Sequence, residues 1–185
     1  MKSGGIDLGR FIRTRIQDFL NENIEFILDK QSEEYDHIFN DYGIEDVSKV
    51  HSDIIKFSKE AIDKFKGKVD IFKDIRIIFV SDIEDALGMF RSGTSTSTPI
   101  ILLSEKNILS GSKEYDVPLW VAVETTIFHE LGHAICELEY NVFGYGYLEY
   151  GDEEKWVEDF AYGLHHYDEI PADLENFIRE YKKQR

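Results

Sequence analysis

Apolar residues recur at steps of three and four positions over two stretches in the first third of the chain. This spacing places apolar side chains on one face of an α-helix. The first stretch covers residues 12–28, and the second runs from Val47 to Phe65, just before Gly67, a residue type that often ends a helix. We therefore expect residues 1–67 to form an N-terminal helical region in which each helix buries one face.

The pattern changes in the middle of the chain to short runs rich in β-branched residues. Two such runs, Ile75–Val80 and Pro99–Leu103, predict strands, and Leu87–Arg91 predicts a shorter strand between them. The serine- and threonine-rich residues 92–98 predict a polar hairpin loop. The edge of the Pro99–Leu103 strand is a candidate for pairing with an extended peptide, although an ordinary core strand would have the same sequence.

Helical features return in the last third of the chain. Asp116 and Pro118 are typical of a helix start and predict a long helix that ends near Glu139. A loop rich in glycine and tyrosine follows, and further helices are expected over residues 152–166 and after Pro171. Helices on both sides of a few strands predict an α+β fold with a small mixed sheet. Residues 68–185 would form its main domain, packed as one unit with residues 1–67.

Composition and charge narrow the class of protein. The chain has 185 residues, 42% of them hydrophobic, which predicts a folded globule. Its formal net charge of −16 would repel phosphate backbones, so we expect no nucleic-acid partner. The apolar runs are too short to cross a bilayer, and the first residues lack the apolar segment of a secretion signal. With one cysteine, no internal disulfide can form, and we expect a cytoplasmic protein without a membrane partner.

The predicted long helix contains the sequence His129-Glu130-Leu131-Gly132-His133. Histidines at positions i and i+4 lie one turn apart on the same face, so both imidazoles can reach one metal ion. The glutamate after the first histidine can take a proton from metal-activated water. We therefore expect His129 and His133 to bind zinc and Glu130 to be the general base of a hydrolase. A polar helix stripe with solvated histidines is the alternative, but apolar residues flank the motif.

A catalytic zinc normally has three protein ligands, so a third one is needed. Cys136 and Glu139 stand where an extended form of the motif requires glycine and histidine. The next predicted helix offers Glu153, Glu154 and Glu158. We expect Glu154 to be the third ligand and Glu158, one turn later, to hold the N–H of a ligating histidine, with Glu153 nearer to solvent. All three stay candidates, because acidic residues are favoured in the first turn of a helix without any metal.

The segment from Phe128 to Ala134, followed by Glu153 to Ala161, resembles the zincin metallopeptidases of the gluzincin kind. Over residues 116–166 it is most similar to the ImmA/IrrE-type peptidases of bacteria and their mobile elements, and to minimal phage-type metallopeptidases. It departs from the ImmA/IrrE pattern at residues 156–158, where Trp-Val-Glu replaces the usual Glu-Ala-Asn. The resemblance implies a zincin-like fold, a zinc cofactor, a glutamate of the second helix as third ligand, and a protein or peptide substrate such as a repressor-like protein.

Several other side chains are candidates for roles near such a site. Either His165 or His166 could donate to the oxyanion of the reaction, although histidines at a helix C-terminus also suit the helix dipole. Cys136 is expected to be a small buried thiol. The tyrosines of the predicted loop could donate to the oxyanion or form a packed lid; they are Tyr145, Tyr147 and Tyr150.

Two other classes of protein fit part of the pattern. Di-iron carboxylate oxidoreductases use Glu-x-x-His on two helices, and this chain has Glu130-Leu-Gly-His133 and Glu34-Tyr-Asp-His37. The predicted strands and the unused His129 argue against such a four-helix bundle. The other class is a metal-bound but inactive zincin-like binding protein, since the motif specifies a site and not turnover.

Overall fold

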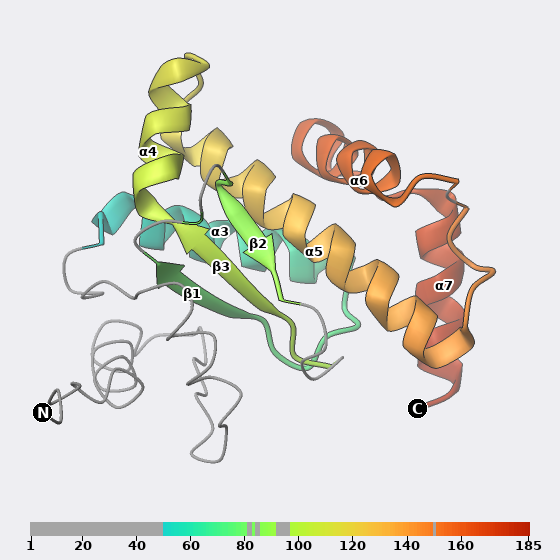
Figure 1. Cartoon of the computed structure of the whole chain (residues 1–185). Helices are drawn as coiled ribbons and strands as arrows, with labels where there is room; N and C mark the ends of the chain where they lie inside the picture. The colour runs from blue at the N-terminus through green and yellow to red at the C-terminus, as the bar shows by residue number, and fades with distance from the viewer. Residues whose placement is uncertain (1–49, 81–82, 84–85, 92–96, 150) are drawn as a thin grey trace, which may run out of the picture.

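The computed structural model describes residues 50–80, 83, 86–91, 97–149 and 151–185 (Figure 1). In chain order, the elements of this part are α3 (Ser52–Lys68), β1 (Arg76–Val80), β2 (Gly88–Phe90), β3 (Ile100–Ser104), α4 (Glu105–Glu114), α5 (Leu119–Phe143), α6 (Glu153–Tyr167) and α7 (Ala172–Lys183). The expected α+β class is confirmed. The helix expected over residues 12–28, and most of the 1–67 region, lie outside the described residues.

The described strands form a mixed sheet in the order β1-β3-β2. β1 runs parallel to β3, with Arg76 opposite Ile100, and β2 runs antiparallel to it, with Gly88 opposite Leu103. All residues of β3 are buried, as expected for a strand paired on both sides. Of the two interpretations left open for Pro99–Leu103, the ordinary core strand is confirmed, because β1 and β2 occupy both edges of β3.

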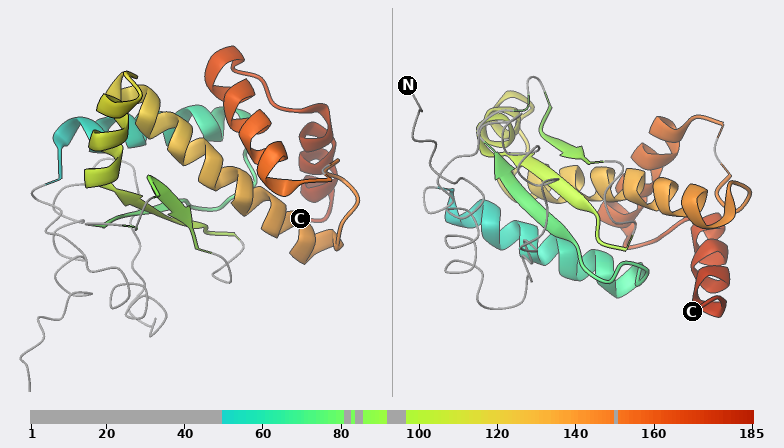
Figure 2. Two further views of the ribbon diagram at one scale, coloured as in Figure 1. Left: turned by 45° about the horizontal axis from the view of Figure 1, so that its top comes forward. Right: turned by 60° about the horizontal axis from the view of Figure 1, so that its bottom comes forward.

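Helices α3 and α5 lie together on one face of the sheet (Figures 1 and 2). Their apolar faces and the strands form one continuous hydrophobic core. Phe65 of α3 stacks on Phe72 at 6.1 Å between ring centroids and meets Phe160 of α6 edge-on at 6.3 Å. The core thus extends across the expected boundary between residues 67 and 68.

Helix α5 is longer than the pattern predicts, because it continues past Glu139 to Phe143. Phe143 lies against Tyr147 and against Phe177 of α7, so burial of its ring stabilises the last turn. The helix ends at Gly144, whose φ of 82° suits a residue without a Cβ. Within the described residues, no helix has both the length and the apolar character needed to cross a bilayer.

Helix α4 was not predicted from the sequence. It follows β3 directly, and the Ser104 side chain caps it by accepting a hydrogen bond from the Asn107 N–H at 3.2 Å. Glu105 in its first turn and Lys113 in its last turn also suit the helix dipole. These start and stop signals are present in the sequence, but few apolar positions accompany them, so periodicity did not reveal the helix.

Candidate metal centre

The two histidines of the motif lie side by side in the middle of α5. Their Nε2 atoms are 3.3 Å apart, and their rings meet edge to face at 5.0 Å between centroids. Both side chains are about a quarter exposed, 27% for His129 and 23% for His133. The helical period alone places them on one face, as expected.

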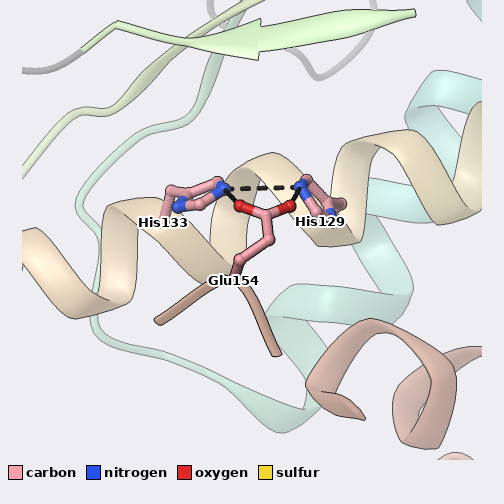
Figure 3. A group of neighbouring side chains, drawn as sticks. All are labelled: His129, His133 and Glu154. Carbon is pink, nitrogen blue, oxygen red and sulfur yellow. Dashed lines mark hydrogen bonds and ion pairs between the residues drawn. The ribbon is translucent and has the colours of Figure 1, made fainter. Parts of the chain in front are cut away.

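Glu154, in the first turn of α6, extends its carboxylate between the two imidazoles (Figure 3). Its Oε1 lies 3.0 Å from Nε2 of His129, and its Oε2 lies 3.3 Å from Nε2 of His133. Tetrahedral ligands bonded at roughly 2.05 Å to zinc are separated by about 3.3 Å from one another. The spacing of these atoms therefore suits a single small ion, and two imidazole nitrogens with a carboxylate oxygen are a donor set typical of zinc.

Gly132, between the two histidines, allows α6 to pack closely against α5. A Cβ at this position would lie only 2.9 Å from Cγ1 of Val157 and 3.3 Å from Cδ1 of Phe160. Val157 and Phe160 are both fully buried in the core. A larger residue would move α6 away, and with it Glu154.

Glu153 also reaches the histidines. Its Oε1 lies 2.8 Å from Nδ1 of His133, where it can accept the ring N–H and leave the lone pair of Nε2 for a metal. The expectation that Glu158 holds the N–H of a motif histidine is therefore wrong, because Glu153 takes that position. Glu153, expected nearer to solvent, is exposed and still reaches His133. Glu158 is exposed and has no hydrogen bond or ion pair with His129 or His133. Adjacent helical residues point about 100° apart, but an imidazole has nitrogens on two sides, so both carboxylates can contact the pair.

Glu130 is buried next to the histidines, on the side of β2. Its Oε2 accepts the backbone N–H of Phe90 at 2.6 Å. Burial raises the pKa of Glu130 above the ordinary glutamate value, although charges on His129 and the Phe90 N–H act in the opposite direction. Gly88 makes this contact possible, since a Cβ there would lie 2.6 Å from Cγ2 of Thr126 and would hold β2 away from α5.

A pocket of about 450 Å³ adjoins these residues. All residues of β2 line this pocket. Glu130 and His133 are among the residues that α5 contributes to it, and α6 contributes Glu153. Glu130 and His133 therefore face a space that can hold part of a ligand, and pockets of this volume are typical of ligand sites.

The loop that leads into α6 is held by the buried carboxylate of Glu139. Its Oε1 accepts the backbone N–H groups of Gly146, Tyr147 and Leu148 at 3.1, 2.8 and 3.0 Å. Glu139 is fully buried on the last turns of α5. It therefore determines the path of the chain toward Glu153 and Glu154, a role that nothing in the local sequence indicated.

Asp173 of α7 also holds the loop between α5 and α6, at the end that is nearer to α6. Its Oδ2 accepts the N–H of Glu149 at 2.8 Å and Nε1–H of Trp156 at 3.0 Å. Asp152 caps α6 itself by accepting the N–H of Glu154 at 3.1 Å. The start of α6 is thus positioned by carboxylates from three parts of the chain.

A second polar cluster connects α6 to α5 and α3, away from His129, His133 and Glu154. Glu124 of α5 lies 2.8 Å from both Nδ1 of His165 and Nζ of Lys64. His165 is eleven residues after Glu154 in the same helix, about 16 Å along the axis at 1.5 Å per residue. The suggestion that His165 donates to an oxyanion is therefore wrong. His166, the other candidate, lies in contact with the ring of Tyr162 instead, at 4.2 Å between centroids.

The loop tyrosines have different surroundings. Tyr145 lines the pocket beside Glu130. Tyr147 packs against Phe143 and Phe177, so it belongs to the apolar contacts of α7. Tyr150 lies outside the described residues. Of the two that the structure describes, Tyr145 is the one that shares the pocket with Glu130 and His133.

Cys136 is a buried thiol, as expected, with 2% of its surface exposed. Burial raises the pKa of this thiol well above its ordinary value, and neighbouring carboxylates add to the effect. It is therefore held as the neutral, unreactive form. Glu34 and His37, on which the di-iron interpretation depends, lie outside the described residues.

Comparison with known proteins gives no relative for this chain. No protein-family model matches it, and no curated protein or solved structure does. The resemblance to zincins stays a prediction from short motifs, and the case for a function depends on the geometry of this site.

Proposed function

We propose that the protein is a zinc-dependent metallopeptidase. The observation that carries the proposal is the position of Glu154, whose carboxylate lies 3.0 and 3.3 Å from the two histidine Nε2 atoms. Glu130, the residue type that serves as general base in this motif, lies beside this group and lines the adjoining pocket. A carboxylate from a second helix, two histidines and a buried glutamate are the parts that a catalytic zinc site of this type requires.

His129, His133 and Glu154 would hold the ion, with Glu153 orienting His133 through its Nδ1. A zinc ion bound by three protein groups lowers the pKa of its water to about 7 and polarises a substrate carbonyl. Catalytic zinc sites combine three protein ligands with a water or substrate in the remaining position, whereas structural sites are closed by four protein groups, and the group proposed here has three donors.

Glu130 would move the proton that peptide hydrolysis requires. It accepts a proton from the attacking water as the new C–O bond forms at the peptide carbonyl. It then gives this proton to the leaving nitrogen as the C–N bond breaks, so the products are a carboxylic acid and an amine. Its raised pKa brings it closer to the operating pH, where a general base works best. The Phe90 N–H orients its carboxylate.

β2 would be the strand that receives an extended peptide. It lies at an edge of the described sheet and lines the pocket. A peptide added along such an edge gains main-chain hydrogen bonds while its side chains enter neighbouring pockets. The Phe90 N–H would not take part in this pairing, because it donates to Glu130. The substrate class is therefore a flexible segment of a protein or a peptide.

The test combines metal content with hydrolysis. We expect about one zinc per chain by mass spectrometry of the purified protein, and loss of that zinc on His129→Ala or His133→Ala. Glu130→Gln should keep the zinc and lose hydrolysis of unfolded protein substrates by several orders of magnitude, because glutamine cannot accept the proton.

Four outcomes would contradict the proposal. If a variant that combines His129→Ala and His133→Ala still bound one zinc per chain, these histidines would not form the zinc site. If Glu130→Gln hydrolysed substrate at nearly the wild-type rate, Glu130 would not be the general base. Zinc binding without any peptide hydrolysis would favour an inactive binding protein, and two irons per chain would favour the oxidoreductase class.

A further inference from the structure

The side chains of the mixed sheet alternate between its two faces. A Cβ at Gly88 would lie against Thr126 of α5, so Gly88 and the residues in register with it are on the face that α3 and α5 cover. The alternate positions of the strands form the opposite face, which we call the far face. Its apolar side chains are Ile78, Val80, Ile100 and Leu102.

The far face is buried, although none of the described helices lies on it. Each of its four apolar side chains is at most 1% exposed. Of the described helices, α3 and α5 cover the other face of the sheet (Figures 1 and 2). Strands that are buried on both faces are apolar at successive positions, and β1 and β3 have this composition. The far face therefore requires a cover from a part of the chain that the described residues do not include.

One stretch outside the described residues is long enough to supply this cover. The internal gaps are between one and five residues long, whereas 49 residues precede Val50. This stretch includes the helix predicted over residues 12–28, whose apolar side is formed by Ile16, Leu20 and Ile24 among others. A helix of that length extends for about 25 Å and a five-residue strand for about 17 Å, so one helix can cross the whole face.

The same stretch joins the described part of the chain beside the sheet. Val50 is buried, and His51 donates its backbone N–H to Oε2 of Glu105 at 2.7 Å. Glu105 directly follows β3, whose end lies next to the end of β1 because the two strands are parallel. Residues 29–49 can extend for about 3.3 Å each, which is ample for the predicted helix to return over the sheet.

We propose that residues 12–28 form a helix that covers the far face of the sheet. Its apolar side would pack on Ile78 and Leu102, and its charged side would face water. The sheet would then lie between two helical layers, with α3 and α5 on the other side. A segment of the same chain is favoured here over a second copy, because a linked segment has an effective concentration on the order of millimolar.

The experiment measures how fast a thiol on each face of β3 reacts with a maleimide in the 185-residue chain. Leu102→Cys places the thiol on the far face and Ile101→Cys places it on the face under α5, each combined with Cys136→Ser. We expect both thiols to be protected. Adding Ile16→Asp and Leu20→Asp should raise the rate at least about tenfold for Leu102→Cys and less than about twofold for Ile101→Cys, because buried charges would displace the helix.

Thr14→Asp with Asn21→Asp is the matched control, since it adds the same two charges on the polar side of the predicted helix and should leave both rates unchanged. Fast labelling of Leu102→Cys by itself would overturn the proposal. So would protection that persists with Ile16→Asp and Leu20→Asp, or a rise of equal size on both faces of β3. Protection of Leu102→Cys that weakens on dilution would show that a second copy covers this face, and would also overturn it.

Discussion

Three glutamates at the start of α6 differ sharply in what their side chains touch. Glu154 lies between the two Nε2 atoms, Glu153 contacts the outer nitrogen of His133, and Glu158 is exposed without contact to either histidine. At the residue scale, the proposed metal centre therefore assigns one ligand, one orienting carboxylate and one residue without a role.

The difference predicts a graded loss of zinc affinity. Glu153→Gln should weaken zinc binding by roughly 10–100-fold, as is typical when a group that orients a ligand is lost. Glu154→Ala should weaken it by more than that, because a ligand is removed. Competition with a chromophoric chelator measures all variants on one scale.

Glu158→Ala is the matched control, from one turn further along the same helix, and should stay within about twofold of the wild type. If Glu158→Ala lost more zinc affinity than Glu153→Gln, the orienting role assigned to Glu153 would be contradicted.

Burial of Glu130 predicts how stability depends on pH in the metal-free protein. Its folded pKa is raised, so the folded state binds this proton more tightly than the unfolded state does. Stability should therefore fall as pH rises from the unfolded value of about 4.3 through the raised folded value. We expect Glu130→Gln to be more stable than the wild type at pH 7 and similar to it below about pH 4.

Chemical unfolding in the presence of a chelator, at pH 4 and pH 7, measures this difference. A Glu130→Gln protein that is less stable than the wild type at pH 7 would show that the Phe90 N–H contact outweighs the cost of burial.

At the scale of elements, the proposed metal centre depends on how closely α5 and α6 approach. The helices run antiparallel, since Glu124 early in α5 meets His165 late in α6, while His133 meets Glu153. Gly132 marks the closest approach near the histidines. The loop held by Glu139 then delivers the first turn of α6 to this point.

Gly132→Ala should therefore destabilise the protein despite the better helix propensity of alanine. The new Cβ would lie 2.9 Å from Cγ1 of Val157, and overpacking of a buried contact costs about 1–3 kcal/mol in the free energy of unfolding. Zinc affinity should fall as well, because α6 must move with Glu154. Urea unfolding and zinc titration measure the two effects.

Gly67→Ala provides the control within another helix. Nothing lies within 4 Å of a Cβ at Gly67 in α3, so this change should be neutral or stabilise by up to about 1 kcal/mol. If Gly132→Ala behaved like Gly67→Ala in both measurements, the close approach of α5 and α6 would not constrain the site.

At the scale of the whole molecule, the proposed ligands join separate parts of the structure. His129 and His133 belong to the helix that packs on the sheet, and Glu154 belongs to the helix that packs on α5 from beyond the loop (Figure 1). The complete group exists only when both helices are docked, so an ion bound there stabilises the folded state.

Zinc should therefore raise the melting temperature of the metal-free protein. A free zinc concentration of one hundred times Kd would add about 2.7 kcal/mol to the free energy of unfolding. Glu154→Ala should lose this shift at the same zinc concentration while Glu158→Ala keeps it, as measured by scanning calorimetry. An equal shift in wild type and Glu154→Ala would indicate that zinc binds elsewhere.

The sequence by itself determined the elements and the part of the site that lies within one helix. The strands and most helices in the described residues follow from local periodicity and from helix start and stop signals. His129, Glu130 and His133 could be grouped without a structure, because a period of 3.6 residues places i and i+4 together whatever surrounds the helix.

Only the tertiary structure decided which residues from elsewhere meet this helix. The contact of Glu130 with Phe90 spans 40 residues, and that of His133 with Glu153 spans 20. The sequence favoured Glu154 over Glu153 and Glu158 as the third ligand without excluding either, and the contacts of all three depend on the angle and distance at which α6 crosses α5. That geometry is set by the packing of Gly132 against Val157 and by the buried hydrogen bonds of Glu139, which no local pattern encodes.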